Sequence, residues 1–255
     1  MSSPIRIMIN GFGRIGRSVL RLVLAQPDQF QVVRINDIAP LDSCVYLFQY
    51  DSVFGPYPDP VRAEADGLTV KGQHIPVTHL RDISQLDLSD IDIVFECTGH
   101  IATREQADKG LQAGAGKVLI SGPADIADLT VVLGANDHHL ADQMVVSNAS
   151  CTTNALAPLL RVLDDAFGVH SGHMTTVHCY TGSQPTVDAP RGDLVRSRAA
   201  ALSMVPTTTS AGKLIGIVLP HLAGRIEARA IRVPTASVSA IDLAVQTVKP
   251  TSTGE

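Results

Sequence analysis

The sequence predicts an α/β protein in which a doubly wound parallel sheet is followed by a second, α+β domain. Through residues 1–150, apolar runs typical of buried strands alternate with helical patterns, as in successive βαβ units. A glycine-rich turn joins the first apolar run to the first helical pattern, an arrangement typical of Rossmann-type sheets. This alternation stops at Cys151. We therefore expect one domain over 1–150 and another over 151–255.

In the first domain, several apolar runs are continuous, as expected for strands covered by helices on both faces. These strands are Ile5–Ile9, Val32–Ile35, Ile91–Glu96, Val118–Ile120, Val131–Gly134 and Val145–Ser147. Helical patterns cover Arg14–Leu24 and Arg104–Ala113. Residues Leu68–Val70 and His74–Thr78 predict a hairpin insertion.

In the second domain, we expect a helix, a strand, a long polar loop, a second helix and two more strands. These elements are Thr152–Ala166, Met174–Tyr180, Thr181–Arg198, Ser210–Leu219, Ala228–Val233 and Val238–Val248. Their order predicts an α+β domain.

The composition narrows the class of protein. Apolar residues make up 45% and charged residues 18%, which is typical of a globular chain. The net charge of −5 and the absence of a basic run argue against nucleic-acid binding. No apolar stretch has the length of a membrane span, and no signal peptide is evident. The four cysteines are widely spaced, with no CxxC pair or metal-ligand constellation, so we expect free thiols, no metal and a cytoplasmic location.

A nucleotide site is predicted at the first strand-to-helix junction, where Asn10–Gly16 contains the pattern GxGxxG. Gly11 permits the tight turn, Gly13 lets a pyrophosphate approach the backbone, and Gly16 allows close helix–strand packing. The amide groups at the helix N-terminus attract phosphate. Asp37 follows the second strand at the position of an acid that binds ribose hydroxyls and repels a 2′-phosphate, which favours NAD over NADP. A structural glycine turn followed by an aspartate turn residue is the alternative.

A reactive thiol is predicted at Cys151, where a strand meets a helix. Unpaired amides at a helix N-terminus stabilise a thiolate, and Ser150 and Thr152 add hydroxyl donors. His178 lies near the end of the next apolar strand and could exchange a proton with the thiol. The alternatives are an inert buried cysteine and a core histidine.

Five motifs together resemble the glyceraldehyde-3-phosphate dehydrogenase family. They are NGFGRIGR, SNASCTTN, TTVH, RAA and RVPTxxVSxxDL, and the similarity extends from Ile5 to about Val248. The resemblance implies that the 1–150 domain binds NAD and that the 151–255 domain is catalytic. It also implies phosphorylating oxidation of glyceraldehyde 3-phosphate with inorganic phosphate, through a thioester, in a homotetramer.

The resemblance also implies the roles of individual residues. Cys151 is the implied nucleophile and His178 the implied general base. The cofactor-side residues are Gly11, Phe12, Gly13, Arg14, Ile15, Gly16, Asp37 and Ser121. Thr181 and Arg232 are the implied ligands of the substrate phosphate, and Ser150, Thr152 and Thr209 are those of the attacking phosphate. Ser210 follows Thr209 in the latter site, and Arg196 can also serve a phosphate.

The sequence departs from the family pattern at several positions. Ala155 replaces a second cysteine, Val53–Phe54 replaces a segment that usually contains histidine, and Ser210 replaces a glycine. Arg196 stands where paired arginines are often found. These departures leave the thiol chemistry in place but bear on which aldehyde is used.

Two alternatives remain open. A sister family oxidises erythrose 4-phosphate with the same nucleophile and base and uses water in place of phosphate. A catalytically silent NAD-binding or interaction protein is the other possibility. Chains of the family continue beyond the last residue here, so we expect the second domain to be incomplete at its carboxyl end.

Overall fold

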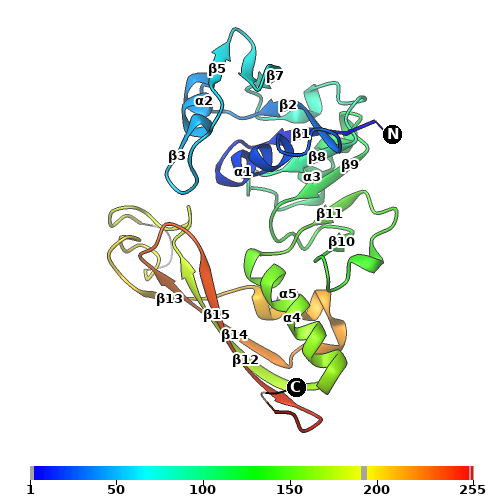
Figure 1. The fold of residues 1–255 in the computed structure, drawn as a ribbon, viewed down its shortest axis with the longest axis vertical. Coiled ribbons are helices and arrows are strands. Elements are labelled where there is room, and N and C mark those ends of the chain that lie inside the picture. The colour runs from blue at the N-terminus through cyan, green and yellow to red at the C-terminus, as the bar shows by residue number, and fades with distance from the viewer. Residues whose placement is uncertain (1–2, 191–193, 253, 255) are drawn as a thin grey trace. The chain divides into compact units, whose positions relative to one another are not determined.

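The computed structural model describes residues 3–190, 194–252 and 254, and its contacts divide the chain into two compact units. The first unit comprises Met1–Thr130 and Leu140–Asn148, and the second comprises Val131–His139 and Ala149–Glu255. The expected polar loop over 181–198 includes residues 191–193, which lie outside the described residues. Figure 1 shows the elements of each unit.

The first unit contains a nine-stranded sheet in the order β10-β11-β9-β8-β1-β2-β7-β6-β5. All neighbours from β10 to β7 are parallel, and β6 is antiparallel to both β7 and β5. The strand bounds are β1 Ile5–Asn10, β2 Phe30–Asn36, β5 Val61–Glu64, β6 Gly67–Val70, β7 Gln73–Thr78, β8 Ile93–Glu96, β9 Lys117–Ile120, β10 Leu129–Thr130 and β11 Val145–Ser147. β1 lies between β2 and β8, so the strand order changes direction there, and the predicted doubly wound sheet is confirmed.

Both faces of this sheet are buried. Because side chains alternate along a strand, Ile7 and Ile9 enter one core cluster, together with Leu20 of helix α1 (Arg14–Val23). Met8 enters a separate cluster with Ala107 of helix α3 (Arg104–Gln112). The continuous apolar runs of the sequence are therefore explained by helices on both faces.

Two helices differ in how well the sequence predicts them. Helix α3 begins with a capping box, in which the Thr103 hydroxyl accepts from the Gln106 amide at 3.3 Å and the Gln106 side chain accepts from the Thr103 amide at 3.1 Å. Helix α2 (Leu41–Gln49) was not predicted, and it buries Phe48 in the core beside α1. The pair of short strands β3 (Tyr50–Asp51) and β4 (Gly55–Pro56) follows it.

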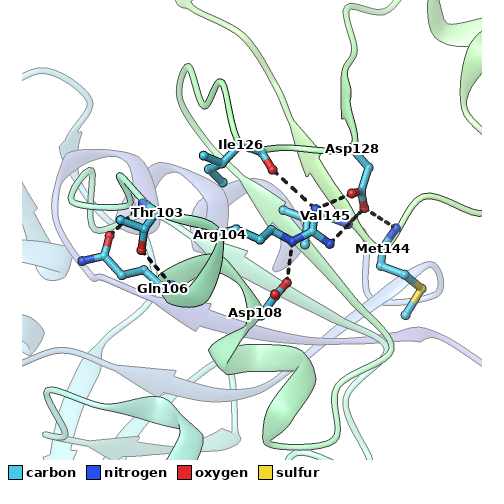
Figure 2. Close-up of polar contacts among 8 residues, drawn as sticks. All are labelled: Thr103, Arg104, Gln106, Asp108, Ile126, Asp128, Met144 and Val145. Carbon is cyan, nitrogen blue, oxygen red and sulfur yellow. Dashed lines mark hydrogen bonds and ion pairs between the residues drawn. The ribbon is translucent and has the colours of Figure 1, made fainter.

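Arg104 connects the start of α3 to the edge of the sheet (Figure 2). Its guanidinium contacts the carboxylates of Asp108 and Asp128. The Asp128 carboxylate also accepts hydrogen bonds from the backbone amides of Met144 at 3.1 Å and Val145 at 2.9 Å. One carboxylate therefore holds the beginning of β11 against the segment that leads into β10.

The prediction of a strand over Val131–Gly134 was wrong. Sheet pairing ends at Thr130, which pairs with Ser147. Gly134 has a φ of +78°, and its amide donates to the Asp137 carboxylate, so the chain turns into a short 3₁₀ helix over Asp137–His139. The apolar character of Val132 reflects burial in the core of the second unit.

The second unit contains a four-stranded sheet in the order β13-β14-β12-β15. The strands are β12 Val169–Cys179, β13 Val205–Thr207, β14 Ile226–Val233 and β15 Ser239–Thr247. β12 is parallel to β14 and antiparallel to β15, so the sheet is mixed. Helices α4 (Cys151–Phe167) and α5 (Ala211–Val218) cover it and share a buried core that includes Leu156, Leu160 and Ile215. No helix among the described residues has the length and apolar character needed to cross a membrane.

Candidate active site

The glycine turn of the first unit has the geometry that a dinucleotide requires. Gly11 has a φ of +91°, and a Cβ there would lie 2.7 Å from the Thr98 nitrogen. A Cβ on Gly16 would lie 2.1 Å from the Gly11 carbonyl oxygen. A Cβ on Gly13 would meet nothing within 4 Å. Gly11 and Gly16 are therefore required by the protein's own packing, whereas Gly13 borders open space that a ligand can approach.

Asp37 fixes this turn from the end of β2. Its carboxylate accepts from the Phe12 amide at 2.6 Å and from the Ala39 amide at 2.8 Å. These bonds orient the carboxylate and place it on the wall of the nucleotide cavity. Asp37 is thus both a turn residue and a candidate ribose ligand, and the two roles that the sequence suggested for it are compatible.

A cavity of about 380 Å³ adjoins the turn, and its wall contains three of the predicted cofactor residues: Gly11, Gly13 and Asp37. Four others, Phe12, Arg14, Ile15 and Gly16, belong to the same turn or helix but do not line this cavity. Ser121 follows β9, where its hydroxyl lies near the Cys97 thiol. Backbone amides at a helix N-terminus, an open glycine and an oriented carboxylate form a suitable site for NAD.

Sequence reasoning missed a buried polar network at this cavity. Asn10, Asn36 and Glu96 are the last residues of β1, β2 and β8, and all three are at most 8% exposed. The Asn10 amide donates to Glu96 at 2.5 Å, and the Asn36 amide donates to Asn10 at 2.8 Å. The sequence did contain a signal, because each of these polar residues ends a strand that is rich in apolar residues. The carboxyl ends of parallel strands form the ligand-binding edge of such sheets.

The thiol that the sequence predicts to be reactive lies on the first turn of α4. Ser150 is the N-cap residue, and its hydroxyl accepts from the Thr153 amide at 3.1 Å. Cys151 is the first helical residue and is exposed. The Cys151 Sγ lies 3.2 Å from the Nε2 of His178, which is near the end of β12. The structure therefore brings the two predicted catalytic residues into hydrogen-bonding contact.

His178 is buried and held from its far side. Its Nδ1 lies 2.7 Å from the Cys179 carbonyl oxygen and 2.5 Å from the Nη1 of Arg232. Burial and the Arg232 charge hold the pKa of His178 below its usual value, although the Cys179 carbonyl acts in the opposite direction. Burial and the neighbouring Arg196 likewise lower the pKa of Arg232. At neutral pH the imidazole is therefore uncharged and can accept a proton.

A pocket of about 350 Å³ lies beside the thiol and the imidazole. Its lining contains both predicted catalytic residues and six predicted phosphate ligands: Ser150, Thr152, Arg196, Thr209, Ser210 and Arg232. The remaining predicted ligand, Thr181, does not line the pocket, and its hydroxyl contacts Ser183 at 3.0 Å. Sequence reasoning missed Thr176, Thr208 and Ala230, which complete the wall. Two cations among neutral hydroxyls are well suited to phosphate oxygens.

A nucleotide-binding Rossmann-type unit together with a cysteine–histidine pair beside a cationic pocket defines a thiol-dependent dehydrogenase. Comparisons with known proteins identify the family of dehydrogenases. Residues 5–104 match the family model "Glyceraldehyde 3-phosphate dehydrogenase, NAD binding domain", and residues 150–255 match the model "Glyceraldehyde 3-phosphate dehydrogenase, C-terminal domain". The chain belongs to the glyceraldehyde-3-phosphate dehydrogenase family.

Individual relatives agree with this assignment. The glyceraldehyde-3-phosphate dehydrogenase of Xanthobacter flavus is 49% identical, with 98% of this chain and 76% of the relative covered. The Cereibacter sphaeroides enzyme is 48% identical over the same shares. The Pseudomonas aeruginosa enzyme is 48% identical, with 98% and 77% covered.

Proposed function

We propose that this protein catalyses the NAD-dependent, phosphorylating oxidation of glyceraldehyde 3-phosphate to 1,3-bisphosphoglycerate. The observation that carries the proposal is the 3.2 Å contact between the Cys151 Sγ and the His178 Nε2, in a pocket that also contains two arginines. The family assignment and the NAD-binding domain support it. We place the protein in the cytosol because all four cysteines are free, and we propose a homotetramer by family resemblance.

The pair Cys151 and His178 performs the covalent steps. The sulfur adds to the aldehyde carbon, which gives a thiohemiacetal. The His178 Nε2 then removes the hydroxyl proton as hydride leaves the same carbon, and a thioester remains on Cys151. Bound NAD supplies the hydride acceptor. The low pKa of His178 keeps its imidazole neutral and able to act as the base.

Phosphate enters the reaction twice, once on the substrate and once as the nucleophile that cleaves the thioester. Arg196 and Arg232 supply positive charge, and the hydroxyls of Ser150, Thr152 and Thr209 supply neutral donors. An oxygen of inorganic phosphate attacks the thioester carbon, which releases the acyl phosphate and restores the Cys151 thiolate. We assign Arg232 to the phosphate of the substrate and Ser150, Thr152 and Thr209 to inorganic phosphate, and Arg196 adds positive charge to the same pocket.

The test is NADH production by the purified protein. With glyceraldehyde 3-phosphate, turnover should require inorganic phosphate, and a Cys151→Ala variant should be inactive although it still binds NAD. Faster turnover of erythrose 4-phosphate without added phosphate would instead support the water-using alternative. A protein that produces no NADH and whose Cys151 does not react with iodoacetamide would support the silent NAD-binding alternative.

A further inference from the structure

Thr176 contributes a buried hydroxyl to the wall of the catalytic pocket. Its side chain is 1% exposed and lies two residues before His178 on β12, so the two side chains share one face of the strand. The Thr176 Oγ1 is buried, and none of the described residues forms a hydrogen bond with it. A buried hydroxyl without a partner is costly, so in a pocket wall it indicates a ligand that supplies the hydrogen bond.

Other hydroxyls of the same wall have partners within the protein. The Ser150 hydroxyl accepts a hydrogen bond from the Thr153 amide at 3.1 Å. The Thr209 hydroxyl accepts one from the Ala211 amide at 3.2 Å. These two oxygens are held in place by the helices that they precede. Thr176 differs from both, because a molecule in the pocket can be the partner of its hydroxyl.

The composition of the wall indicates the chemistry of that molecule. Among the described residues, the lining contains two arginines, one histidine, one cysteine, one alanine and six hydroxyl side chains, and it contains no carboxylate. A threonine hydroxyl can donate a hydrogen bond, and its strongest acceptor beside two cations is the oxygen of an anion. An oxygen of phosphate meets this requirement.

The register of the strands separates Thr176 from the arginine assigned to the substrate phosphate. On β14, Arg232 is directly opposite His178, and Ala230 is directly opposite Thr176. These two levels of the sheet are two residues apart, which is about 7 Å along a strand. The antiparallel strand β13 starts opposite Arg232 and ends at Thr207, opposite Ala230. The chain therefore leaves β13 at the level of Thr176.

The hydroxyls assigned to inorganic phosphate come from the two sides of this level. Thr209 follows the end of β13, on one side of β14. Ser150 and Thr152 are at the start of α4, which packs on β12, on the other side of β14. Thr176 on β12 thus lies between these two groups, with the small side chain of Ala230 opposite it.

We infer that the Thr176 hydroxyl is a further ligand of inorganic phosphate. It donates a hydrogen bond to a phosphate oxygen and keeps its proton throughout the reaction. The inference rests on the proposed function, because it takes inorganic phosphate as the nucleophile that cleaves the thioester. Formation of the thioester does not use this phosphate, so the hydroxyl acts only in the second half of the reaction.

The experiment replaces Thr176 by valine, which has nearly the same shape but no hydroxyl. Binding of inorganic phosphate is measured from the rise in melting temperature that it causes, with sn-glycerol 3-phosphate present to occupy the site of the substrate phosphate. The affinity of Thr176→Val for phosphate should fall about 10-fold or more, the scale of one hydrogen bond to a charged group. In NADH production, the KM for phosphate should rise by the same factor, and the KM for glyceraldehyde 3-phosphate should be unchanged. Thr176→Ser, which keeps the hydroxyl, should behave as the wild type.

Thr207→Val is the matched control. The Thr207 Oγ1 is also buried without a partner among the described residues, but Thr207 is not part of the pocket wall. Each valine variant removes an unpaired hydroxyl, so neither should have a lower melting temperature than the wild type without ligand. Only Thr176→Val should bind phosphate more weakly. A hydroxyl with a merely structural role would instead lower the melting temperature when it is removed.

The outcomes separate this inference from the proposed function. Wild-type affinity for phosphate in Thr176→Val would overturn the inference, and so would an equal loss of affinity in Thr207→Val. A higher KM for glyceraldehyde 3-phosphate at an unchanged KM for phosphate would place the hydroxyl at the substrate and refute the assignment. A wild type that produces no NADH, but binds phosphate more tightly than Thr176→Val, would refute the proposed function and support Thr176 as a phosphate ligand.

Discussion

Substitution by alanine should affect two glycines of the nucleotide turn differently: it should lower the stability of the protein at Gly16 and weaken NAD binding at Gly13. Gly16 lies inside α1, where alanine normally stabilises a helix by about 0.5–1 kcal/mol. Here its Cβ would lie 2.1 Å from the Gly11 carbonyl oxygen, well inside the roughly 3.5 Å of ordinary contact. Overpacking against backbone costs about 1–3 kcal/mol or more, so Gly16→Ala should destabilise the protein. At roughly 3 °C per kcal/mol for a domain of this size, the melting temperature should fall by about 3–9 °C.

Gly13→Ala is the matched control. Gly13 has a φ of −70°, which alanine adopts readily, and its Cβ would meet nothing within 4 Å. The stability of the free protein should therefore change by less than about 0.5 kcal/mol. The same Cβ would occupy the space in which the pyrophosphate approaches the turn, so NAD should bind at least about 10-fold more weakly.

Differential scanning calorimetry without ligand and titration calorimetry with NAD measure the two effects separately. The expected pattern is a lower melting temperature for Gly16→Ala and weaker NAD binding at an unchanged melting temperature for Gly13→Ala. Equal melting temperatures for both variants would refute the packing argument. NAD binding of wild-type strength by Gly13→Ala would refute the placement of the pyrophosphate.

The remaining predictions concern the thiol, its base and the edge of the first sheet. Cys151→Ser should lose dehydrogenase turnover because the proposed mechanism forms its covalent intermediate on this thiol, whereas titration calorimetry should show unchanged NAD binding. Burial holds the pKa of His178 below its ordinary value of 6.5, so below pH 6.5 the unfolded chain binds a proton that the folded chain does not. The free energy of unfolding of the wild type should therefore decrease as the pH falls, and urea unfolding should show a smaller decrease for His178→Gln. The same pH dependence of stability in both proteins would contradict this prediction. Asp128→Ala removes two hydrogen bonds from backbone amides and an ion pair that is partly exposed, which should cost about 2 kcal/mol in urea unfolding. A change below about 0.5 kcal/mol would show that Asp128 does not hold β11 in place.

The parts of the site that the sequence predicted are those fixed by local backbone geometry. The positive φ of Gly11 requires a glycine, and the capping serine Ser150 places Cys151 on the first turn of a helix. Both facts depend on a few consecutive residues. The contact of Cys151 with His178 joins residues 27 positions apart, and it was predicted from the chemistry of the two side chains and from the family motifs, not from local geometry.

The parts that it did not predict depend on partners far away in the chain. Val132 lies in a short apolar run that could be a strand, but its burial comes from the helices of the second unit. Asn10 and Glu96 form one hydrogen bond across 86 residues, so neither residue alone indicates a polar network. The contact of Arg232 with His178 depends on the register of two strands, which no local pattern specifies.

The division of the chain into two units has a consequence for how the protein is made and how it can be divided. The chain crosses from one unit to the other at three points, after Thr130, His139 and Asn148. The short strand β10 is joined to the sheet only through β11, and between these two strands the chain contains Val132 and Ala135, which belong to the core of the second unit. The sheet edge therefore stays open during synthesis until β11 emerges. Because the chain crosses between the units three times, no single cut separates them. An exchange of one unit between relatives would have to transfer two separate stretches of chain.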